Sequence, residues 1–256
     1  MKRAVYPLIL AIGLFTSYCQ AETPITFAGV LAEKIQQHDK QGYLDKIYQE
    51  IARRTSLTIN YDVMPMARTM SLFDHKKVDC ILPGSSNRYF DRTKQHDIVR
   101  SQAISALLLF KFTFERNQAL LAAQDLANVN IGYVRNIKMF NALNMPPFDN
   151  ATHIVASHHR HLFDMLHFGR TELIVGWYPI VNMLATARNS ERVSFDADHV
   201  LSTDYLVVSC HRSHKTEAFI ETINKAISSM WQDGTMVAMH PNGTHHLKAL
   251  FPPPAM

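Results

Sequence analysis

Strand-like and helix-like segments alternate along this chain, and their order constrains its fold more than any single motif does. Residues 25–30 read as a strand, and residues 42–55 as an amphipathic helix with apolar side chains at helical spacing. An alternating, β-branched segment follows at 57–63, a helix begins at Pro65, and residues 78–82 form a third apolar strand. Strands and helices that alternate over short connections favour a parallel sheet with helices on its faces, so the sequence predicts an α/β fold.

The alternation starts again near residue 115. The further elements that we expect are strands at 103–112, 130–134, 152–157, 172–176 and 203–210, and helices at 158–169 and 216–231. The sequence contains no internal repeat, low-complexity tract or Gly/Ser-rich linker. The roughly 235 residues that follow residue 21 are more than one modest core absorbs. We therefore expect one large domain or two small ones, joined in the second case by ordered strands.

The N-terminal segment is typical of a secretory signal peptide. Lys2 and Arg3 form a basic start, residues 4–15 are apolar, and the small residue Ala21 ends the segment. The apolar run is shorter than the roughly 20 residues that a bilayer-spanning helix needs, and a retained membrane anchor is the alternative. Residues 1–21 are therefore predicted to be a cleaved signal peptide, and the mature chain to be exported to the periplasm.

Charge and cysteine content narrow the classes of partner and of fold. Cleavage after Ala21 would remove Lys2 and Arg3 and no acid, which lowers the net charge from +4 to +2. This near-neutral balance gives no support to nucleic acid as a partner. Cys80 and Cys210 are the two cysteines that would be left, each in an apolar strand. They are too few for a disulfide framework in a chain of this length, so two buried thiols and one bridge both remain open.

Four stretches resemble, in their order and spacing, periplasmic solute-binding proteins of family 3, the amino-acid-binding type with the type II periplasmic binding fold. These stretches are residues 42–61, 65–92 (PMARTMSLFDHKKVDCILPGSSNRYFDR), 125–134 and 219–235, within a resemblance that runs from Ile25 to His240. The resemblance implies two lobes, each a mainly parallel sheet flanked by helices, joined by two hinge strands at 106–112 and 204–210. It implies that lobe 1 comprises residues 22–112 and 203–256, and that lobe 2 comprises residues 113–202.

The first lobe carries the strongest candidate for binding an anion. Ligand sites in open α/β sheets lie at the carboxyl ends of the strands, so the loop at Gly84, Ser85 and Ser86 should line the cleft. The resemblance implies that Arg92, just after this loop, holds a ligand carboxylate, for which a guanidinium fork is well matched. An ion pair of Arg92 with a neighbouring aspartate on the surface is the alternative, and Arg88 takes the role if the loop bulges. Arg68, in the first turn of the next helix, either reaches the cleft or caps loops of its own lobe.

The second lobe departs from the pattern of the amino-acid binders. The resemblance implies an acidic residue after the strand at 172–176, as the partner of a ligand ammonium group, but Trp177 and Tyr178 stand there. It also implies a Gly-Thr turn where this chain has Arg135. A missing acid leaves an ammonium group without a counter-charge, whereas an arginine and two aromatic rings favour an anionic or flat apolar ligand. Core packing at a helix start is the alternative for the two aromatic residues.

The histidines and the search for catalytic motifs add no reaction chemistry. His158 and His161 share a helix face with Asp164, but no cysteine or glutamate joins them, so an exposed polar face is favoured over a metal site. The sequence holds no nucleophile elbow, phosphate-binding loop or zinc-hydrolase motif. We therefore expect neither an enzyme nor a metal or cofactor site.

The function expected from the sequence is capture of a small, acidic or amino-acid-like ligand between two lobes. The expected partners are that ligand and a membrane permease of the ABC type, with the protein itself a monomer. A sensory subunit that reports to a membrane receptor, an enzyme on the same fold, and a scaffold without a ligand are the alternatives. The predicted ligand-binding residues are Arg68, Gly84, Ser85, Ser86, Arg92, Arg135, Trp177 and Tyr178.

Overall fold

The computed structural model describes residues 24–32, 34–85, 97–135, 147–178, 180–187 and 192–240. Its strands are β1 (Phe27–Val30), β2 (Tyr61–Met64), β3 (Cys80–Ser85), β4 (Ile98–Arg100), β5 (Ser105–Phe114), β6 (Asn130–Val134), β7 (Thr152–Ala156), β8 (Leu173–Tyr178), β9 (Val193–Phe195) and β10 (Ser202–His211). Its helices are α1 (Tyr43–Thr55), α2 (Met66–Asp74), the 3-10 turn η2 (Glu115–Asn117), α3 (Ala119–Ala122), α5 (His159–His167), α6 (Ile180–Ala187), α7 (His214–Gln232) and α8 (Thr235–Met239). None of the helices in these residues is both long and apolar enough to cross a membrane.

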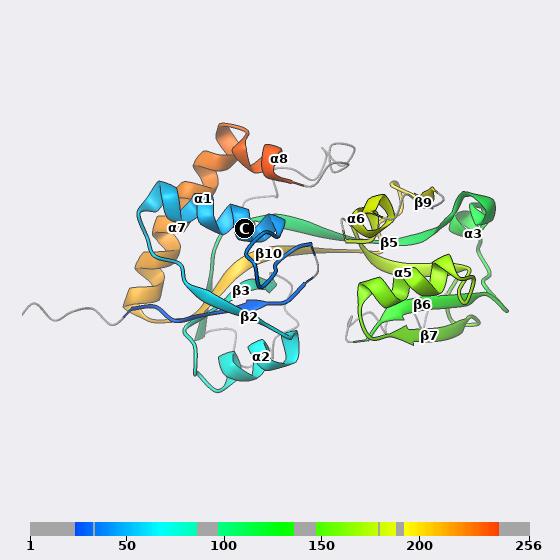
Figure 1. Ribbon diagram of the computed structural model, residues 1–256, viewed down its shortest axis with the longest axis horizontal. Helices are drawn as coiled ribbons and strands as arrows, with labels where there is room; N and C mark the ends of the chain where they lie inside the picture. Colours follow the sequence, from blue (N-terminus) through cyan, green and yellow to red (C-terminus); the bar gives the residue numbers. More distant parts are fainter. Residues whose placement is uncertain are drawn as a thin grey trace, which may run out of the picture.

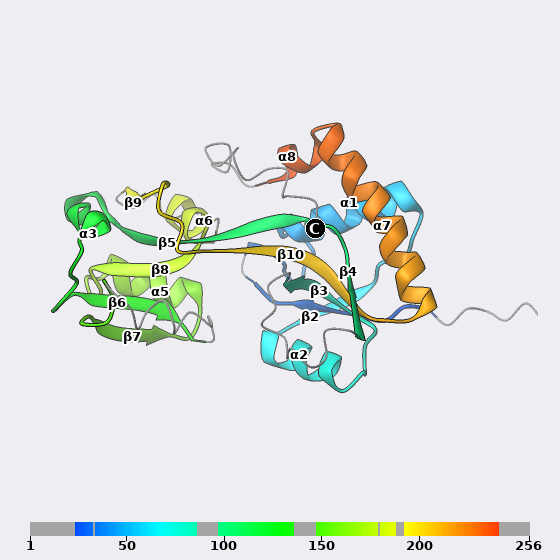
Figure 2. The same ribbon diagram turned by 180° about the vertical axis from the view of Figure 1, so that it is seen from behind.

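The elements form two groups that only β5 and β10 join, as Figures 1 and 2 show from opposite sides. We call the group around β1, β2, β3 and α1 lobe 1, and the group around β6, β7, β8 and α5 lobe 2. Helices α7 and α8 lie with lobe 1 although they follow lobe 2 in the sequence. The chain therefore leaves lobe 1 along β5, builds lobe 2, and returns along β10.

One continuous sheet runs through both lobes in the order β2-β1-β3-β10-β5-β8-β6-β7, with β4 on β10 and β9 on β5. In lobe 1 the central strand β1 is parallel to β2 and β3, and in lobe 2 the central strand β6 is parallel to β7 and β8. The returning strand β10 is antiparallel to β3, β4 and β5, and β5 is antiparallel to β8. The expected α/β fold with two mainly parallel lobes is confirmed.

The link between the lobes is a two-stranded ribbon that we call the bridge. The pairing of β10 with β3 ends at Leu206, and the pairing of β5 with β8 begins at Leu108. Between these points β5 and β10 pair with each other alone among the described strands, through Ala106 with Tyr205 and Leu107 with Asp204. Because a bend here disturbs few contacts, the bridge is where the two lobes can move relative to each other.

The helices of lobe 1 form where the apolar spacing predicts them. Helix α1 buries its apolar face, and its Asp45 side chain accepts hydrogen bonds from the backbone N–H of Gly42 at 3.0 Å and of Gln37 at 2.9 Å. This carboxylate satisfies N–H groups at the helix start and fixes the preceding loop. The buried residues of α7 include the five that its helical spacing predicts to face inward, namely Phe219, Ile220, Ile223, Ala226 and Ile227.

Several strand boundaries differ from the expectation, and strand pairing accounts for three of them. Strand β3 continues past residue 82 to Ser85 because β10 pairs with Gly84 and Ser85. Strand β8 continues past residue 176 to Tyr178 because Trp177 and Tyr178 pair with β5. The alternating segment at 57–63 becomes a strand only from Tyr61, where its pairing with β1 begins. The stretch that we expected to be an open loop after residue 82 is therefore partly a strand.

A disulfide joins Cys80 on β3 to Cys210 on β10. Of the two alternatives that the sequence left open, two buried thiols or one disulfide, the structure adopts the disulfide. The two residues lie directly opposite each other in the antiparallel pair, and neither is exposed. The bond links positions 130 residues apart and ties the returning strand to the core of lobe 1. The disulfide thus anchors the lobe 1 end of the two-stranded bridge covalently.

A second anchor of the bridge is a buried hydrogen-bonded chain at the start of β5. Tyr43 Oη lies 2.8 Å from Ser105 Oγ, and His240 Nε2 lies 3.1 Å from the same oxygen. His240 Nδ1 lies 2.7 Å from the carbonyl oxygen of Met236 and therefore donates to it. Ser105 is not exposed and His240 is 6 % exposed, so this hydrogen-bonded chain lies in the core and docks α8 on the hinge strand.

Burial lowers the pKa of His240, because the imidazolium would lose its hydration, while the Met236 carbonyl acts weakly in the opposite direction. The folded chain therefore favours the neutral ring, whereas the unfolded chain takes up the proton near the ordinary value of about 6.5. It follows that His240 stabilises the fold above this pH, and that this contribution is lost as the pH falls toward the lowered value.

Loss of the disulfide should destabilise the fold. Substitution of both Cys80 and Cys210 by alanine should lower the free energy of unfolding by about 2–4 kcal/mol, because the unfolded chain regains the freedom of a long closed loop. Urea denaturation of the mature chain measures this change. Thiol titration of the unreduced, denatured protein should find no free thiol in the mature chain. Two free thiols would contradict the disulfide.

The His240→Gln variant should show a smaller loss of stability on acidification than the wild type. Glutamine keeps a donor and an acceptor at this site but takes up no proton, so it removes one cause of the fall in unfolding free energy between about pH 7.5 and about pH 5. Urea denaturation at the two pH values measures the difference. His214→Gln, at an exposed position that begins α7, is the matched control. An unchanged pH dependence in His240→Gln would show that another group causes the acid sensitivity.

Candidate functional site

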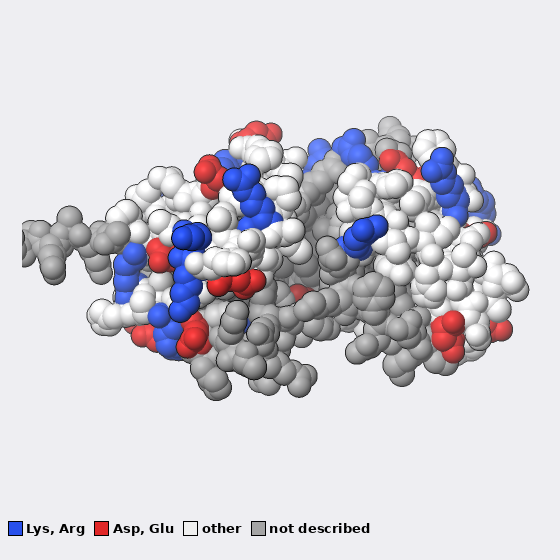
Figure 3. All heavy atoms as spheres, turned by 90° about the horizontal axis from the view of Figure 1, so that it is seen from below, with Lys and Arg blue, Asp and Glu red and all other residues white. Residues whose placement is uncertain are grey.

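The carboxyl ends of the parallel strands in both lobes lie toward the bridge. In lobe 1, Ser85 at the end of β3 pairs with Leu206, next to the bridge, and in lobe 2, Tyr178 at the end of β8 pairs with Leu108 on its other side. Figure 3 shows Lys and Arg side chains on both lobes, on either side of the region between them, which we call the groove. Ligands of open α/β sheets bind at such strand ends, so the candidate site is this groove.

Ser85, which was predicted to line the groove, makes a hydrogen bond to a residue of the bridge. Its hydroxyl donates a hydrogen bond to Asp204 Oδ2 at 2.5 Å, and the Asp204 Oδ1 atom accepts one from the backbone N–H of Tyr205 at 2.8 Å. Since Asp204 lies on the bridge, this contact connects the end of β3 to the ribbon that joins the lobes. The serine hydroxyl and the aspartate carboxylate thus meet beside the bridge.

Gly84 is buried rather than exposed in a loop. It lies on β3 opposite Val207, close to the point where an irregularity between Val207 and Ser209 shifts the register. A β-carbon added at Gly84 would lie 2.1 Å from Ser209 Oγ and 2.7 Å from Ser209 Cβ. The close approach of the two strands therefore requires glycine, and this packing explains the residue without any ligand contact.

Arg68 lies in the first turn of α2, which begins at the carboxyl end of β2, and its side chain is exposed. The next residue, Thr69, is buried, and its hydroxyl donates to the carbonyl oxygen of Gly29 at 3.0 Å. This bond holds the start of α2 against the end of β1. The N–H groups that begin a helix have no acceptor within it and favour negative charge, and Arg68 adds a positive charge at the same edge.

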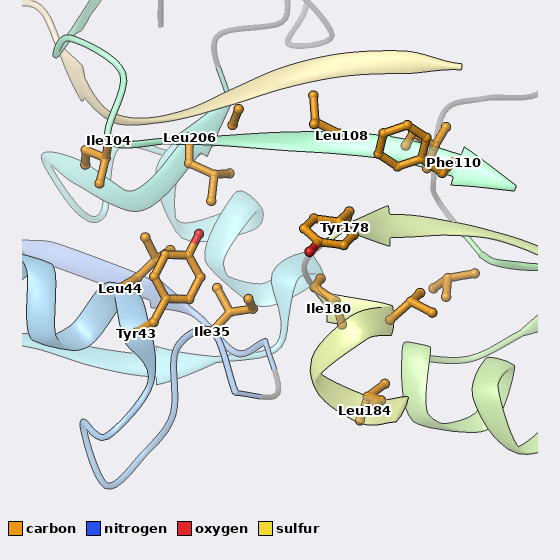
Figure 4. Close-up of a cluster of buried hydrophobic side chains, with 14 of the residues drawn as sticks. Ile35, Tyr43, Leu44, Ile104, Leu108, Phe110, Tyr178, Ile180, Leu184 and Leu206 are labelled. Carbon is orange, nitrogen blue, oxygen red and sulfur yellow. The ribbon is translucent and has the colours of Figure 1, made fainter. Parts of the chain in front are cut away.

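Lobe 2 contributes Arg135 and Tyr178 at its strand ends. Arg135 follows β6 directly, its backbone N–H donates to the carbonyl oxygen of Ala156 at 2.9 Å, and its side chain is exposed. The Tyr178 ring packs against Phe110 and Phe195 at centroid distances of 6.3 and 5.3 Å. Its hydroxyl points toward the side on which Ile35, Tyr43 and Leu44 of lobe 1 lie (Figure 4).

The two aromatic residues at the end of β8 are strand residues and not the start of a helix. Tyr178 is 3 % exposed and its ring packs in the hydrophobic core, so core packing accounts for its burial. Burial raises the pKa of Tyr178, so its hydroxyl keeps its proton and can donate a hydrogen bond. Trp177 is half-buried and packs against the same core. Their role in binding a ligand stays a prediction.

Two of the predicted contacts, Ser86 and Arg92, lie outside the described residues, as does the alternative Arg88. The structure brings Ser85 and Asp204 together and places Arg68, Arg135 and Tyr178 at strand ends of the two lobes. Asp204 was not predicted as a site residue. Its signal in the sequence is a charged residue inside the apolar hinge strand at 203–210, but only strand pairing places it beside Ser85.

His158 has a structural role at the start of α5. Its Nδ1 atom accepts a hydrogen bond from the backbone N–H of His161 at 3.2 Å, which is the contact that an N-cap residue makes. The two rings lie 6.0 Å apart at their centroids. In the described part of the chain, no three histidine, cysteine, aspartate or glutamate residues are close enough together to hold a metal ion.

A separate hollow lies at the other end of the lobe 1 strands. It has a volume of about 750 Å³ and is lined by residues of α1, β1 and the segment that leads into β2, including Lys40, Tyr48, Asn60 and Asp62. Lys40 there donates to the carbonyl oxygen of Tyr61 at 2.6 Å and lies over the Tyr61 ring, so it supports the loop before α1. The hollow contains none of the predicted site residues, and we place the site at the groove.

Gly84→Ala should destabilise the protein, because its methyl group would overlap Ser209. We expect a loss of about 1–3 kcal/mol in the free energy of unfolding, measured by urea denaturation. The matched test is a double-mutant cycle with Ser209→Gly, which removes the two atoms that lie closest to the methyl group. If Gly84→Ala lowers the free energy of unfolding equally in the wild type and in Ser209→Gly, the contact with the Ser209 side chain is not the reason for glycine at position 84.

No protein-family model matches the sequence, and a search of the curated proteins finds no relative. Solved structures do match. The ligand-binding core of GluR0 from Nostoc punctiforme, in complex with L-glutamate, has a TM-score of 0.66 at 12% identity, over 84% of this chain and 97% of that chain. YtmK from Bacillus subtilis, a probable amino-acid ABC transporter extracellular-binding protein, has a TM-score of 0.66 at 14% identity, over 85% and 96%. An ancestral amino acid-binding protein, a precursor of cyclohexadienyl dehydratase, has a TM-score of 0.60 at 13% identity, over 84% and 92%.

These similarities extend over most of each chain and include both lobes and the strands between them. The resemblance to family 3 solute-binding proteins is therefore confirmed at the level of the fold. The chain has the two-lobe type II periplasmic binding fold.

Proposed function

We propose that this protein is an exported solute-binding protein that encloses a small ligand, acidic or amino-acid-like, between its two lobes. The observation that carries the proposal is the bridge, a two-stranded ribbon at which the strand ends of both lobes meet. A ligand that contacts both lobes favours the closed arrangement, because its contacts are complete only there. The bodies would be those expected from the sequence, residues 22–112 with 203–256 and residues 113–202, except that residues 108–112 and Thr203, on the far side of the bridge, would move with lobe 2.

Positive groups at the groove support an acidic group on the ligand. Arg68 and the start of α2 stand at the edge of lobe 1, and Arg135 stands at the end of β6 in lobe 2. Arg92 would add a guanidinium fork from the segment after β3, together with Ser86. Paired hydrogen bonds to a carboxylate are stronger than neutral ones, so these residues can fix an acid in one orientation.

The disulfide supports export of the protein. Such bonds form and persist in oxidising compartments such as the periplasm and are rare in the cytosol. Cleavage of residues 1–21 as a signal peptide would deliver the chain there. In the periplasm a membrane permease of the ABC type would recognise the closed form, and the likeness to YtmK, a probable amino-acid ABC transporter extracellular-binding protein, supports such a partner.

Two other functions have a specific observation in their favour. A sensory role is favoured by the likeness to the VFT2 domain of BvgS from Bordetella pertussis, at a TM-score of 0.63 and 13% identity, and it would use the same closed form to signal. Catalysis on this fold is favoured by the likeness to a precursor of cyclohexadienyl dehydratase. Binding is supported further by Arg68 and Arg135 at the strand ends of the two lobes, which can hold an acid without any reaction.

A ligand should stabilise the mature chain and close it. We expect a thermal shift of several degrees with one or more acids from a panel of amino acids, dicarboxylates and aromatic acids, since a ligand at 100 times its dissociation constant adds about 2.7 kcal/mol. Small-angle X-ray scattering should show a smaller radius of gyration with the same compound. Mass spectrometry of the recovered ligand separates binding from turnover.

The anion contact is tested by substituting arginines singly. Arg92→Ala and Arg135→Ala should each weaken binding at least about tenfold, because each removes a charge-assisted hydrogen bond. Arg170→Ala, at an exposed position just beyond α5, is the matched control. A shift that survives both groove substitutions would show that other residues hold the acid, and no shift with any compound would contradict the proposed function.

A further inference from the structure

Arg68 and Arg135 are exposed arginines without an acidic partner, one at the strand ends of each lobe. Elsewhere in the described chain arginines form ion pairs, as Arg54 does with Glu50 and with Asp233, at 2.7 Å in both cases. The side chains of Arg68 and Arg135 make no hydrogen bond or ion pair with any residue that the structure describes. Both guanidinium groups are therefore free to contact a ligand.

The two arginines belong to parts of the lobes that face each other. Arg68 lies in the first turn of α2, which follows β2, and Arg135 follows β6 directly. Figures 1 and 2 show that β2 and β6 end on the sides of their lobes that face each other. The groove therefore has one free guanidinium group from each lobe.

The backbone of both arginines is fixed although their side chains are free. The N–H of Arg68 donates to the carbonyl oxygen of Pro65 at 2.9 Å, and the N–H of Arg135 donates to the carbonyl oxygen of Ala156 at 2.9 Å. A ligand that contacts these side chains does not have to order the backbone, which lowers the entropy that binding costs. The two groups are thus suited to hold a ligand between the lobes.

Closure of the lobes brings the two positive groups toward each other and removes water from the groove. Like charges that approach in this way oppose closure unless negative charge lies between them. The acid on the bridge, Asp204, is already engaged, because it accepts hydrogen bonds from Ser85 and from the Tyr205 N–H. A ligand with one negative group compensates one arginine, whereas a ligand with two negative groups compensates both. An amine on the ligand would add a further positive charge.

We infer that the ligand is a small dicarboxylate, which Arg68 binds through one carboxylate from lobe 1 and Arg135 binds through the other from lobe 2. This inference rests on the proposed function, and it narrows the ligand from acids in general to acids with two separated negative groups and no amine. A guanidinium fork matches a carboxylate bidentately, so each lobe holds one end of the ligand. Both ends are held at once only in the closed form, so the dicarboxylate favours closure.

Dicarboxylates and their monoamides test the inference on the mature chain. The pairs are succinate with succinamate, glutarate with glutaramate, and adipate with adipamate, so the members of a pair have the same length and differ by one charge. Isothermal titration should find the dicarboxylate of at least one pair bound about tenfold or more tightly than its monoamide, since a charge-assisted hydrogen bond accounts for a factor of this size. Inorganic phosphate, whose charge lies on one group, should bind more weakly than that dicarboxylate.

Substitutions connect this preference to the two arginines. Arg68→Gln and Arg135→Gln should each reduce the preference for the dicarboxylate to about threefold or less. Each should weaken binding of the monoamide less than binding of the dicarboxylate, because a single carboxylate can still bind the arginine that is left. Arg68→Lys keeps the charge and loses the fork, so it should keep part of the preference. Arg170→Gln, at an exposed position just beyond α5, is the matched control and should keep all of it.

The outcomes separate this inference from the proposed function. The inference is overturned if monoamides or phosphate bind as tightly as every dicarboxylate, if an amino acid binds more tightly than all of them, or if the preference survives both glutamine substitutions. Each of these results leaves the solute-binding function standing. Absence of binding by all these compounds and by the wider panel overturns both. If a glutamine variant does not fold, Arg68→Lys and the paired compounds on the wild type decide between these outcomes.

Discussion

The antiparallel pairing of β5 with β10 is the interaction on which the rest of the structure depends. These two strands alone carry the described chain from one lobe to the other, and over Ala106–Tyr205 and Leu107–Asp204 they have no further strand beside them. Each lobe also uses them as members of its own sheet, β10 against β3 and β5 against β8. The ribbon is therefore rigidly fixed at both ends and free to bend only between them, which is the arrangement that hinge motion requires.

The lobe 1 end of this ribbon is anchored in three different ways. The Cys80–Cys210 disulfide ties β10 to the core strand β3, the Tyr43–Ser105–His240 chain docks α1 and α8 on the start of β5, and Gly84 allows β3 to lie close against Ser209. These contacts are buried, so they resist bending outside the bridge. The functional consequence is that motion concentrates at the two pairs next to Ser85 and Tyr178, where the groove lies.

Sequence reasoning located the elements well and the site only in part. Apolar spacing predicted α1, α2, α5 and α7 and most strands, because each buries a face whose period is visible in the sequence. It ended β3 and β8 too early, since Gly84, Ser85, Trp177 and Tyr178 are strand residues only through pairing with β10 and β5. Asp204 could not be assigned to the site, because its contact with Ser85 joins positions 119 residues apart.

By itself the sequence determined the α/β alternation, the order of two interleaved units and the candidate basic residues, because these follow from local periodicity and from residue chemistry. The tertiary structure alone decided that Cys80 and Cys210 are bonded, that Gly84 is a packing residue and that Ser85 orients Asp204 on the hinge strand. Each of these facts depends on strand register between distant segments. Register is set by the packing of the whole sheet, and no local pattern encodes it.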